Sequence, residues 1–326
     1  MVENCCKMKA IGGYFEIEEK GIGVFPHKNG ILLNTGRNSL EYILRTIPYI
    51  EGLILPYYTC EVVLEPINKL NIPYKFYHIN KNLEIDEDLS LPEGWYIIAN
   101  NYFGIKDSYI KFLAEKYKGQ LIIDCAQAFF SPQNIGMKMF YSTRKYVGVP
   151  DGGVAYGISD ASSDNLGIDD SSERLNHLYI RKEKGAEAGF RIYQENESKL
   201  DNQDIRRMSS LTKDILDSID YEYIKKKRRT NFQYIHNYLK NLNHLSLPSI
   251  DSFVCPMVYP FYSSDPTLKK KLINNKIFVA TYWPNVFEWC KEDSIEYQLA
   301  NKIVPIPIDQ RYGEKEMNYI LKTILK

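Results

Sequence analysis

The sequence lacks the cysteine and histidine patterns that bind metals or build disulfide frameworks. Its 326 residues include six cysteines, two of them the adjacent Cys5 and Cys6, but no CxxC pair. The five histidines are scattered, and none forms an HxxxH pair. Zinc sites need such closely spaced ligands, and disulfide-rich domains are much shorter chains. We therefore expect reduced thiols and no metal site.

An excess of charge of one sign and long apolar runs are also missing. The 41 basic and 41 acidic side chains cancel, which argues against a nucleic-acid partner. The dense basic run KKKRR at 225–229 falls inside a helical pattern and predicts a solvated helix face. No apolar stretch approaches the roughly 18 residues that would span a membrane, and the N-terminus lacks the order of a secretory signal. We expect a cytoplasmic protein without a membrane span.

The first half of the chain alternates short apolar runs with amphipathic segments. Most of the runs are too continuously apolar to leave one face in solvent, which is typical of parallel strands covered on both sides. Between them, TCEVVLEPINKL and DSYIKFLAEKYK have helical spacing. This pattern predicts an α/β fold with a mainly parallel central sheet flanked by helices. The expected strands are 30–34, 52–56, 74–79, 95–100 and 120–124.

After residue 155 the pattern changes. Residues 157–175 are rich in Gly, Ser and Asp and predict a loop. The following stretch places Met208, Leu211, Ile215 and Ile219 on one face of a long helix that reaches residue 239. The tail mixes short strands with helices, as a small α+β domain does. We predict a large domain over residues 1–215 and a small C-terminal domain over 216–326.

Chemically useful residues follow the expected strands. Ligands of open α/β sheets bind beyond the carboxyl ends of the strands. There, a glycine-led helix start suits a phosphate, a buried acid suits a protonated pyridine nitrogen, and a lysine suits attack on a carbonyl. Together these groups describe pyridoxal phosphate (PLP). The set consists of Gly36, Arg37, Asn38, Tyr57, Tyr58, Thr59, Asn101, Asp124, Gln127, Ser142 and Lys145.

A dinucleotide site is a poorer interpretation of the glycines. The segment GIGVFP at 21–26 has only the first two glycines of GxGxxG, and no helical pattern follows it at once.

The same blocks carry a family resemblance. LNTGRNSLEYIL, LPYYTCEVVLEPI, NYFGI, LIIDCAQAFF, YSTRKYVGVPDGG and VPIPIDQRY stand in the order found in sugar aminotransferases of the DegT/StrS type, across about residues 30 to 313. The resemblance implies PLP fold type I, like that of aspartate aminotransferase, with a small C-terminal α+β domain. It also implies PLP as the cofactor.

Carried over position by position, the resemblance assigns roles. Lys145 is similar to the lysine that forms the Schiff base, and Asp124 to the acid that pairs with the pyridine nitrogen. Gln127 matches a position near the ring, and Asn101 the place where relatives often have a histidine. The cofactor's phosphate is assigned to Gly36, Arg37, Asn38 and Ser142.

Two positions depart from the family pattern. Cys60 stands where relatives commonly carry the aromatic residue that stacks on the ring, and Tyr58 is the substitute. The GxNxR block, through which the partner subunit of relatives reaches the phosphate, is not evident in DNQDIRRM.

The resemblance implies transfer of an amino group from an amino acid such as glutamate to a nucleotide-linked keto sugar, in polysaccharide or amino-sugar biosynthesis, by a homodimer. Arg144, Tyr146, Tyr282 and Trp283 are candidates for the sugar-nucleotide pocket. Two alternatives stay open: another PLP reaction, such as dehydration or amination of a non-sugar acceptor, and a non-catalytic binding or assembly protein. Asp309 and Arg311 are interpreted as a structural ion pair.

Overall fold

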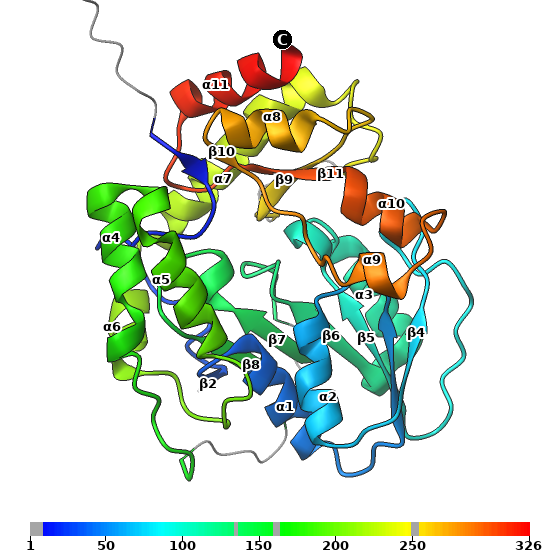
Figure 1. The fold of residues 1–326 in the computed structure, drawn as a ribbon. Helices are drawn as coiled ribbons and strands as arrows, with labels where there is room; N and C mark the ends of the chain where they lie inside the picture. The colour runs from blue at the N-terminus through cyan, green and yellow to red at the C-terminus, as the bar shows by residue number, and fades with distance from the viewer. Residues whose placement is uncertain (1–8, 134–135, 159–163, 249–253) are drawn as a thin grey trace, which may run out of the picture.

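A seven-stranded sheet forms the centre of the computed structural model, which describes residues 9–133, 136–158, 164–248 and 254–326 (Figure 1). The strand order is β2-β8-β7-β6-β5-β3-β4, and β3 to β7 are all parallel. β8 is antiparallel to both of its neighbours. The predicted, mainly parallel sheet is confirmed. Its strands are β2 (Ile31–Leu33), β3 (Gly52–Pro56), β4 (Tyr74–Tyr77), β5 (Trp95–Asn100), β6 (Leu121–Cys125), β7 (Lys138–Ser142) and β8 (Gly153–Tyr156).

Both faces of the sheet are buried, which explains the continuous apolar runs. In β3, Leu53 belongs to the hydrophobic core that includes α1 and α2, whereas its neighbour Ile54 belongs to the core that includes α3. Successive strand residues point to opposite faces, so each face needs its own apolar set. The helices named here are α1 (Gly36–Thr46), α2 (Leu64–Lys69) and α3 (Asp107–Tyr117).

The C-terminal part builds a separate hydrophobic core above the sheet in Figure 1. The short strand β1 (Ile11–Gly12) pairs in parallel with β10, and Ile11 lies in this C-terminal core. The start of the described chain therefore packs with the region expected to be the small domain, whereas the boundary at 215/216 stays a prediction. The elements are α7 (Tyr221–Leu239), β9 (Val258–Tyr262), α8 (Leu268–Asn274), β10 (Ile277–Phe278), α9 (Val286–Trp289), α10 (Ile295–Lys302), β11 (Ile303–Pro307) and α11 (Glu314–Leu325).

The prediction of a single long helix from residue 208 is wrong. The chain forms α6 (Ser210–Leu216) and, after a break, α7. The side chain of Ser209 accepts from the N–H of Thr212 at the start of α6, and Asp220 accepts from Tyr223 at the start of α7. Two such N-caps begin two helices because each satisfies backbone donors that lack partners in the first turn.

A pair of packed helices was not predicted. α4 (Asn176–Lys184) and α5 (Ala186–Ser198) lie side by side at one edge of the molecule, next to β1 (Figure 1). No helix in the described part of the chain is long and apolar enough to cross a membrane. Cys60, Cys125, Cys255 and Cys290 are free thiols, whereas Cys5 and Cys6 lie outside the described residues.

Candidate active site

Lys145 stands at the carboxyl end of β7, in the short turn Thr143–Lys145. Its side chain is exposed and lines a large cavity. The two glycines that follow hold this turn against the start of α1, because a Cβ on Gly153 would come within 2.2 Å of the Thr35 carbonyl oxygen. A Cβ on Gly152, whose φ is +121°, would lie 2.3 Å from Oγ1 of Thr143. The paired glycines of the sequence thus allow the lysine turn and the helix start to meet.

Asp124 lies near Lys145 at the end of β6. Its carboxylate accepts a hydrogen bond from the N–H of Ala126 at 2.7 Å. Burial raises the pKa of Asp124 to about 6, while the Ala126 N–H and the nearby Lys145 cation act in the opposite direction. A buried carboxylate with so little compensation favours a cationic hydrogen-bond donor as a partner.

The start of α1 and the end of β7 together form a candidate anion site. An ideal Cβ on Gly36 would lie 3.5 Å from Cβ of Ser142 and 4.0 Å from its hydroxyl oxygen. The N–H of Asn38 bonds to Thr35, whereas those of Gly36 and Arg37 have no partner among the described residues. Free N–H groups at a helix start, beside a hydroxyl, suit a phosphate.

The side chains of Arg37 and Asn38 have other partners. Arg37 Nη1 contacts Glu65 at 2.6 Å and Asp201 at 2.7 Å. The Asn38 amide donates to the backbone oxygen of Gln203 at 2.9 Å. These contacts anchor α1 to α2 and to the segment after α5. Arg37 therefore offers the anion site its backbone N–H, whereas the N–H of Asn38 is already bonded to Thr35.

Asn101, expected near the cofactor, is enclosed in a turn. Its Nδ2 donates to Asp107 at 2.6 Å and to Ser131 at 2.9 Å, and its oxygen accepts from the N–H of Lys106. Sequence reasoning missed the preceding residue, Asn100, which pairs in register with Asp124. Asn100 is a polar residue at the end of a buried strand, and Asp124 stands one residue before the end of the neighbouring strand. This shared position is the sequence feature by which Asn100 could have been predicted.

Asn100 lies beside Asp124 and has a side-chain oxygen without a hydrogen-bond partner among the described residues. Its Nδ2 donates to Oγ1 of Thr59 at 2.9 Å, and its buried Oδ1 has no hydrogen-bond partner among the described residues. Gln127 lies two residues after the Asp124 strand, and its Oε1 accepts from the N–H of Phe103 at 3.0 Å. The Nε2 of Gln127 has no acceptor in the described part of the chain.

Tyr58 is buried against other aromatic side chains. Its ring meets that of Trp283 edge-on at 4.5 Å between centroids, and Tyr102 is tilted against it at 5.6 Å. Burial raises the pKa of Tyr58. Cys60, two residues further along the chain, is partly exposed.

The cavity that Lys145 lines has a volume of about 730 Å³. Its wall is formed by the N-terminal segment, α4, α5, the lysine turn and the C-terminal part. A volume in this range is typical of sites for drug-sized ligands, about 300–1,000 Å³. Of the candidates for a sugar-nucleotide pocket, Arg144 and Tyr282 line it.

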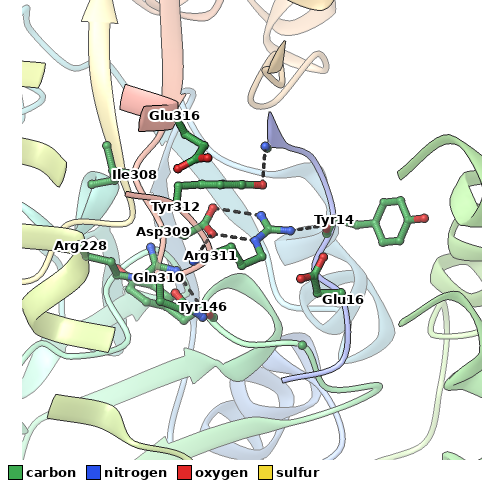
Figure 2. A network of polar contacts seen from close by, with 12 residues as sticks. Tyr14, Glu16, Tyr146, Arg228, Ile308, Asp309, Gln310, Arg311, Tyr312 and Glu316 are labelled. Atoms are coloured by element: carbon green, nitrogen blue, oxygen red, sulfur yellow. Dashed lines mark hydrogen bonds and ion pairs between the residues drawn. The ribbon is translucent and has the colours of Figure 1, made fainter. Parts of the chain in front are cut away.

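The N-terminal segment is bound to this wall by the C-terminal part (Figure 2). Tyr312 accepts at its hydroxyl from the N–H of Gly12 at 2.7 Å, and Arg311 Nη1 donates to the backbone oxygen of Tyr14 at 3.0 Å. Arg311 also pairs with both oxygens of Asp309, at 2.7 and 3.0 Å, which confirms the structural ion pair. That pair holds the pKa of Asp309 below its usual value despite burial.

The basic run at 225–229 is not entirely a solvated face, and that prediction is wrong for Arg228. This side chain is fully buried, with Nη1 donating to the Met257 oxygen at 2.8 Å and Nη2 to the Tyr146 oxygen at 3.1 Å. Its guanidinium lies 4.4 Å from the centre of the Tyr146 ring. Arg228 therefore fixes the backbone directly after Lys145. The charge is tolerated because two carbonyl groups and a ring face replace water.

Comparison with known proteins finds likeness in structure. No family model matches the sequence, and no curated protein matches it. Spr1654 from Streptococcus pneumoniae, solved in apo, PLP and PMP forms, superposes in the PMP form with a TM-score of 0.65 at 14% identity, over 96% of this chain and 92% of that one. A DegT DnrJ EryC1 StrS aminotransferase from Brucella abortus gives 0.55 at 14% identity, over 90% and 84%.

A third solved structure, DesI in the presence of its TDP-sugar product, gives a TM-score of 0.61 at 12% identity, over 90% of this chain and 79% of that one. These likenesses confirm that the chain has the expected fold of PLP fold type I.

Proposed function

We propose that this protein is a PLP-dependent aminotransferase. The observation that carries the proposal is the meeting of Lys145 and Asp124 at one edge of the sheet, beside an anion site at Gly36 and Ser142. A reactive amine, a buried acid and a phosphate cradle are the three groups that PLP needs. The fold shared with PLP-form and PMP-form structures supports the same conclusion.

The residues present fit the cofactor. The buried carboxylate of Asp124 has a hydrogen bond from one backbone N–H and would accept a second from a protonated ring nitrogen. The phosphate would be bound by the N–H groups of Gly36 and Arg37 and by the hydroxyl of Ser142. The positive end of the α1 dipole would help to compensate the phosphate charge. Gln127 offers its free Nε2 to the ring's oxygen, and Tyr58 stays the candidate for contact with the ring.

Bound PLP supplies an electron-accepting ring that stabilises negative charge on a carbon next to nitrogen. Lys145 would have two tasks in this chemistry. Its Nζ would hold the cofactor covalently and would take the proton from the α-carbon of an amino substrate. Asp124 would keep the ring nitrogen protonated. Arg228 positions the backbone of Tyr146, so that Nζ returns to the same place in each turnover.

The proposed substrates are an amino acid such as glutamate and a nucleotide-linked keto sugar. The cavity at Lys145 is large enough for the second, and the structurally similar DesI was solved with a TDP-sugar product. We place the enzyme in the cytoplasm, in polysaccharide or amino-sugar biosynthesis, as a homodimer. Light scattering of the purified protein would give the mass of two chains if the dimer forms.

Covalent attachment of PLP to Lys145 is the test. Purified protein given PLP should develop an absorption band in the near-visible range, and borohydride should fix the cofactor onto the peptide that contains Lys145, as mass spectrometry would show. Lys145→Ala should lose both signals. Lys182→Ala, which removes an exposed lysine on α4, is the matched control and should keep both.

Two outcomes would contradict the proposal at different levels. Absence of the band in wild-type protein at saturating PLP would refute the PLP assignment. A band that glutamate does not convert to the amine form, or that no keto substrate restores, would refute the aminotransferase reaction and favour a different PLP reaction.

A further inference from the structure

The N-terminal segment, residues 11–18, crosses the loop that follows Lys145. This lysine loop comprises residues 146–149. A Cβ on Gly148 would lie 1.6 Å from the backbone oxygen of Glu16, so only glycine leaves room for the crossing. The N–H of Glu18 donates to the Gly148 oxygen at 3.3 Å, and Oε2 of Glu18 accepts from the N–H of Gly148 at 3.2 Å. Glu18 therefore holds the chain three residues after the lysine, through both its backbone and its side chain.

Gln310 joins Glu18 to the C-terminal part. Nε2 of Gln310 donates to Oε2 of Glu18 at 3.1 Å and to the Tyr146 oxygen at 2.9 Å. The Tyr146 oxygen accepts a second bond from Arg228, and Figure 2 shows Gln310, Arg228 and Tyr146 close together. One amide group thus contacts both the carboxylate and the residue directly after Lys145. Three parts of the chain that are distant in the sequence meet at the lysine loop.

The carboxyl group of Glu18 is a titratable group that the proposed chemistry does not use. Burial raises its pKa, whereas the hydrogen bonds from Gly148 and Gln310 and the charges of Arg311 and Arg228 act in the opposite direction. A buried carboxylate needs such donors to compensate for lost hydration. Both donors converge on Oε2, so an apolar side chain at this position would leave the N–H of Gly148 without its acceptor.

The next carboxylate along the chain has a different environment. The side chain of Glu19 is 84% exposed, and its contact with Lys182 on α4, at 3.4 Å, is a surface ion pair. Such pairs contribute little to stability. Two adjacent residues of the same type therefore differ in one respect that matters here: Glu18 contacts the lysine loop and Glu19 faces solvent.

Lys145 depends on the loop because no contact fixes its amine. Its side chain is exposed, and Nζ has no hydrogen-bond partner in the part of the chain that the structure describes. The backbone before it is fixed by Thr143, whose N–H and hydroxyl both donate to the Gly152 oxygen. The backbone after it is fixed by the network around Glu18. A displacement of about 1 Å at a reacting group can cost on the order of 100-fold in rate.

We propose that Glu18 is a positioning residue for Lys145, which acts through Gly148 to hold Nζ where it can bond to the aldehyde of the cofactor. The inference rests on the proposed function for the covalent bond that Lys145 makes. Glu18 itself contacts neither the cofactor nor the amine, unlike Asp124.

Two ligands separate the positioning of Nζ from general damage to the site. Nζ can bond to the aldehyde carbon of PLP with loss of one water, whereas pyridoxine phosphate has an alcohol there and binds without a covalent bond. In Glu18→Met, stopped-flow absorbance at saturating PLP should show the rate constant of covalent attachment reduced by about 10- to 100-fold. The Kd for pyridoxine phosphate, from calorimetry, should change much less.

Two further variants sharpen the test. Glu18→Gln keeps a side-chain oxygen for the N–H of Gly148 and for Gln310, so it should attach PLP nearly as fast as wild type. Glu19→Met is the matched control, because it removes the adjacent, exposed carboxylate, and should also behave like wild type.

Hydrogen exchange of the cofactor-free protein separates this inference from the proposed function. The peptide that contains Gly148 should exchange faster in Glu18→Met than in wild type or Glu18→Gln. An unchanged rate of attachment in Glu18→Met, or an equal loss of pyridoxine phosphate binding, would overturn the positioning role. If wild-type protein forms no covalent link to PLP, the proposed function fails, and faster exchange in Glu18→Met still supports the contact of Glu18 with the lysine loop.

Discussion

The charge of Asp124 has a cost that the substitution Asp124→Asn should reveal. Burial raises the pKa of this carboxyl group from 3.8 to about 6. The folded protein therefore binds the proton more tightly than the unfolded chain, and stability is lost as the pH rises through this range. Asparagine keeps an oxygen to accept the Ala126 N–H but carries no charge. In the cofactor-free protein, the neutral variant should be the more stable one.

The expected size follows from the same two values. Because one pKa unit corresponds to about 1.36 kcal/mol, ionised Asp124 costs about 3 kcal/mol at pH 8. At pH 5, where the group is mostly protonated in the folded state, the cost is about 1.5 kcal/mol. Urea denaturation of cofactor-free protein should therefore show Asp124→Asn more stable at both pH values, with a gap about twice as large at pH 8.

Bound PLP should act in the opposite direction and stabilise the wild-type protein more than the Asp124→Asn variant. A protonated ring nitrogen compensates the Asp124 charge, so PLP should raise the melting temperature of wild type more than that of Asp124→Asn. Asp293→Asn removes an exposed carboxylate and should show neither effect. A cofactor-free Asp124→Asn variant that is less stable than wild type at pH 8, or a gap that does not widen with pH, would refute the reasoning.

Two further substitutions test the support around Lys145. Ser142→Ala removes a hydroxyl beside Gly36 and should raise the Kd for PLP by about 10-fold or more, since hydrogen bonds to charged groups contribute about 1.5–3 kcal/mol; an unchanged Kd in a spectrophotometric titration would exclude Ser142 from the phosphate site. Arg228→Met removes the donor of the buried Met257 carbonyl and one of the two donors of the Tyr146 carbonyl, and should lower the free energy of unfolding by about 2–5 kcal/mol in urea, whereas the exposed Lys226→Met should change it by less than about 0.5. Equal effects of the two would contradict the structural role of Arg228.

The buried arginine shows how a charge run can mislead. KKKRR looks like a solvated face because four of its five side chains are at least partly exposed. Helical spacing, however, places Arg228 on the same face as Ile224, Phe232 and Ile235, all of them buried. The helical period therefore predicts that Arg228 is buried, although its residue type suggests exposure.

The two adjacent asparagines show a second limit. Sequence reasoning predicted that a polar residue after β5 faces the site, and chose Asn101. Successive strand residues point to opposite sides, so a shift of one residue exchanges the two roles. The strand ends at Asn100, which lies opposite Asp124, and Asn101 turns into the loop that Asp107 and Ser131 hold.

Strands β2 to β6 and helices α1 to α3 were predicted from the sequence, because strand burial and helix amphipathicity leave their period in neighbouring residues. The position of Asp124 at the end of β6 follows from that local order, whereas β7 and β8, which carry and follow the Lys145 turn, were not among the expected strands. The cavity lies beyond any local pattern, since it depends on contacts of Tyr14 with Tyr193 and of Gly12 with Tyr312, the latter two 300 residues apart. Such contacts form between elements that are distant in the sequence, so they follow from how those elements pack against one another.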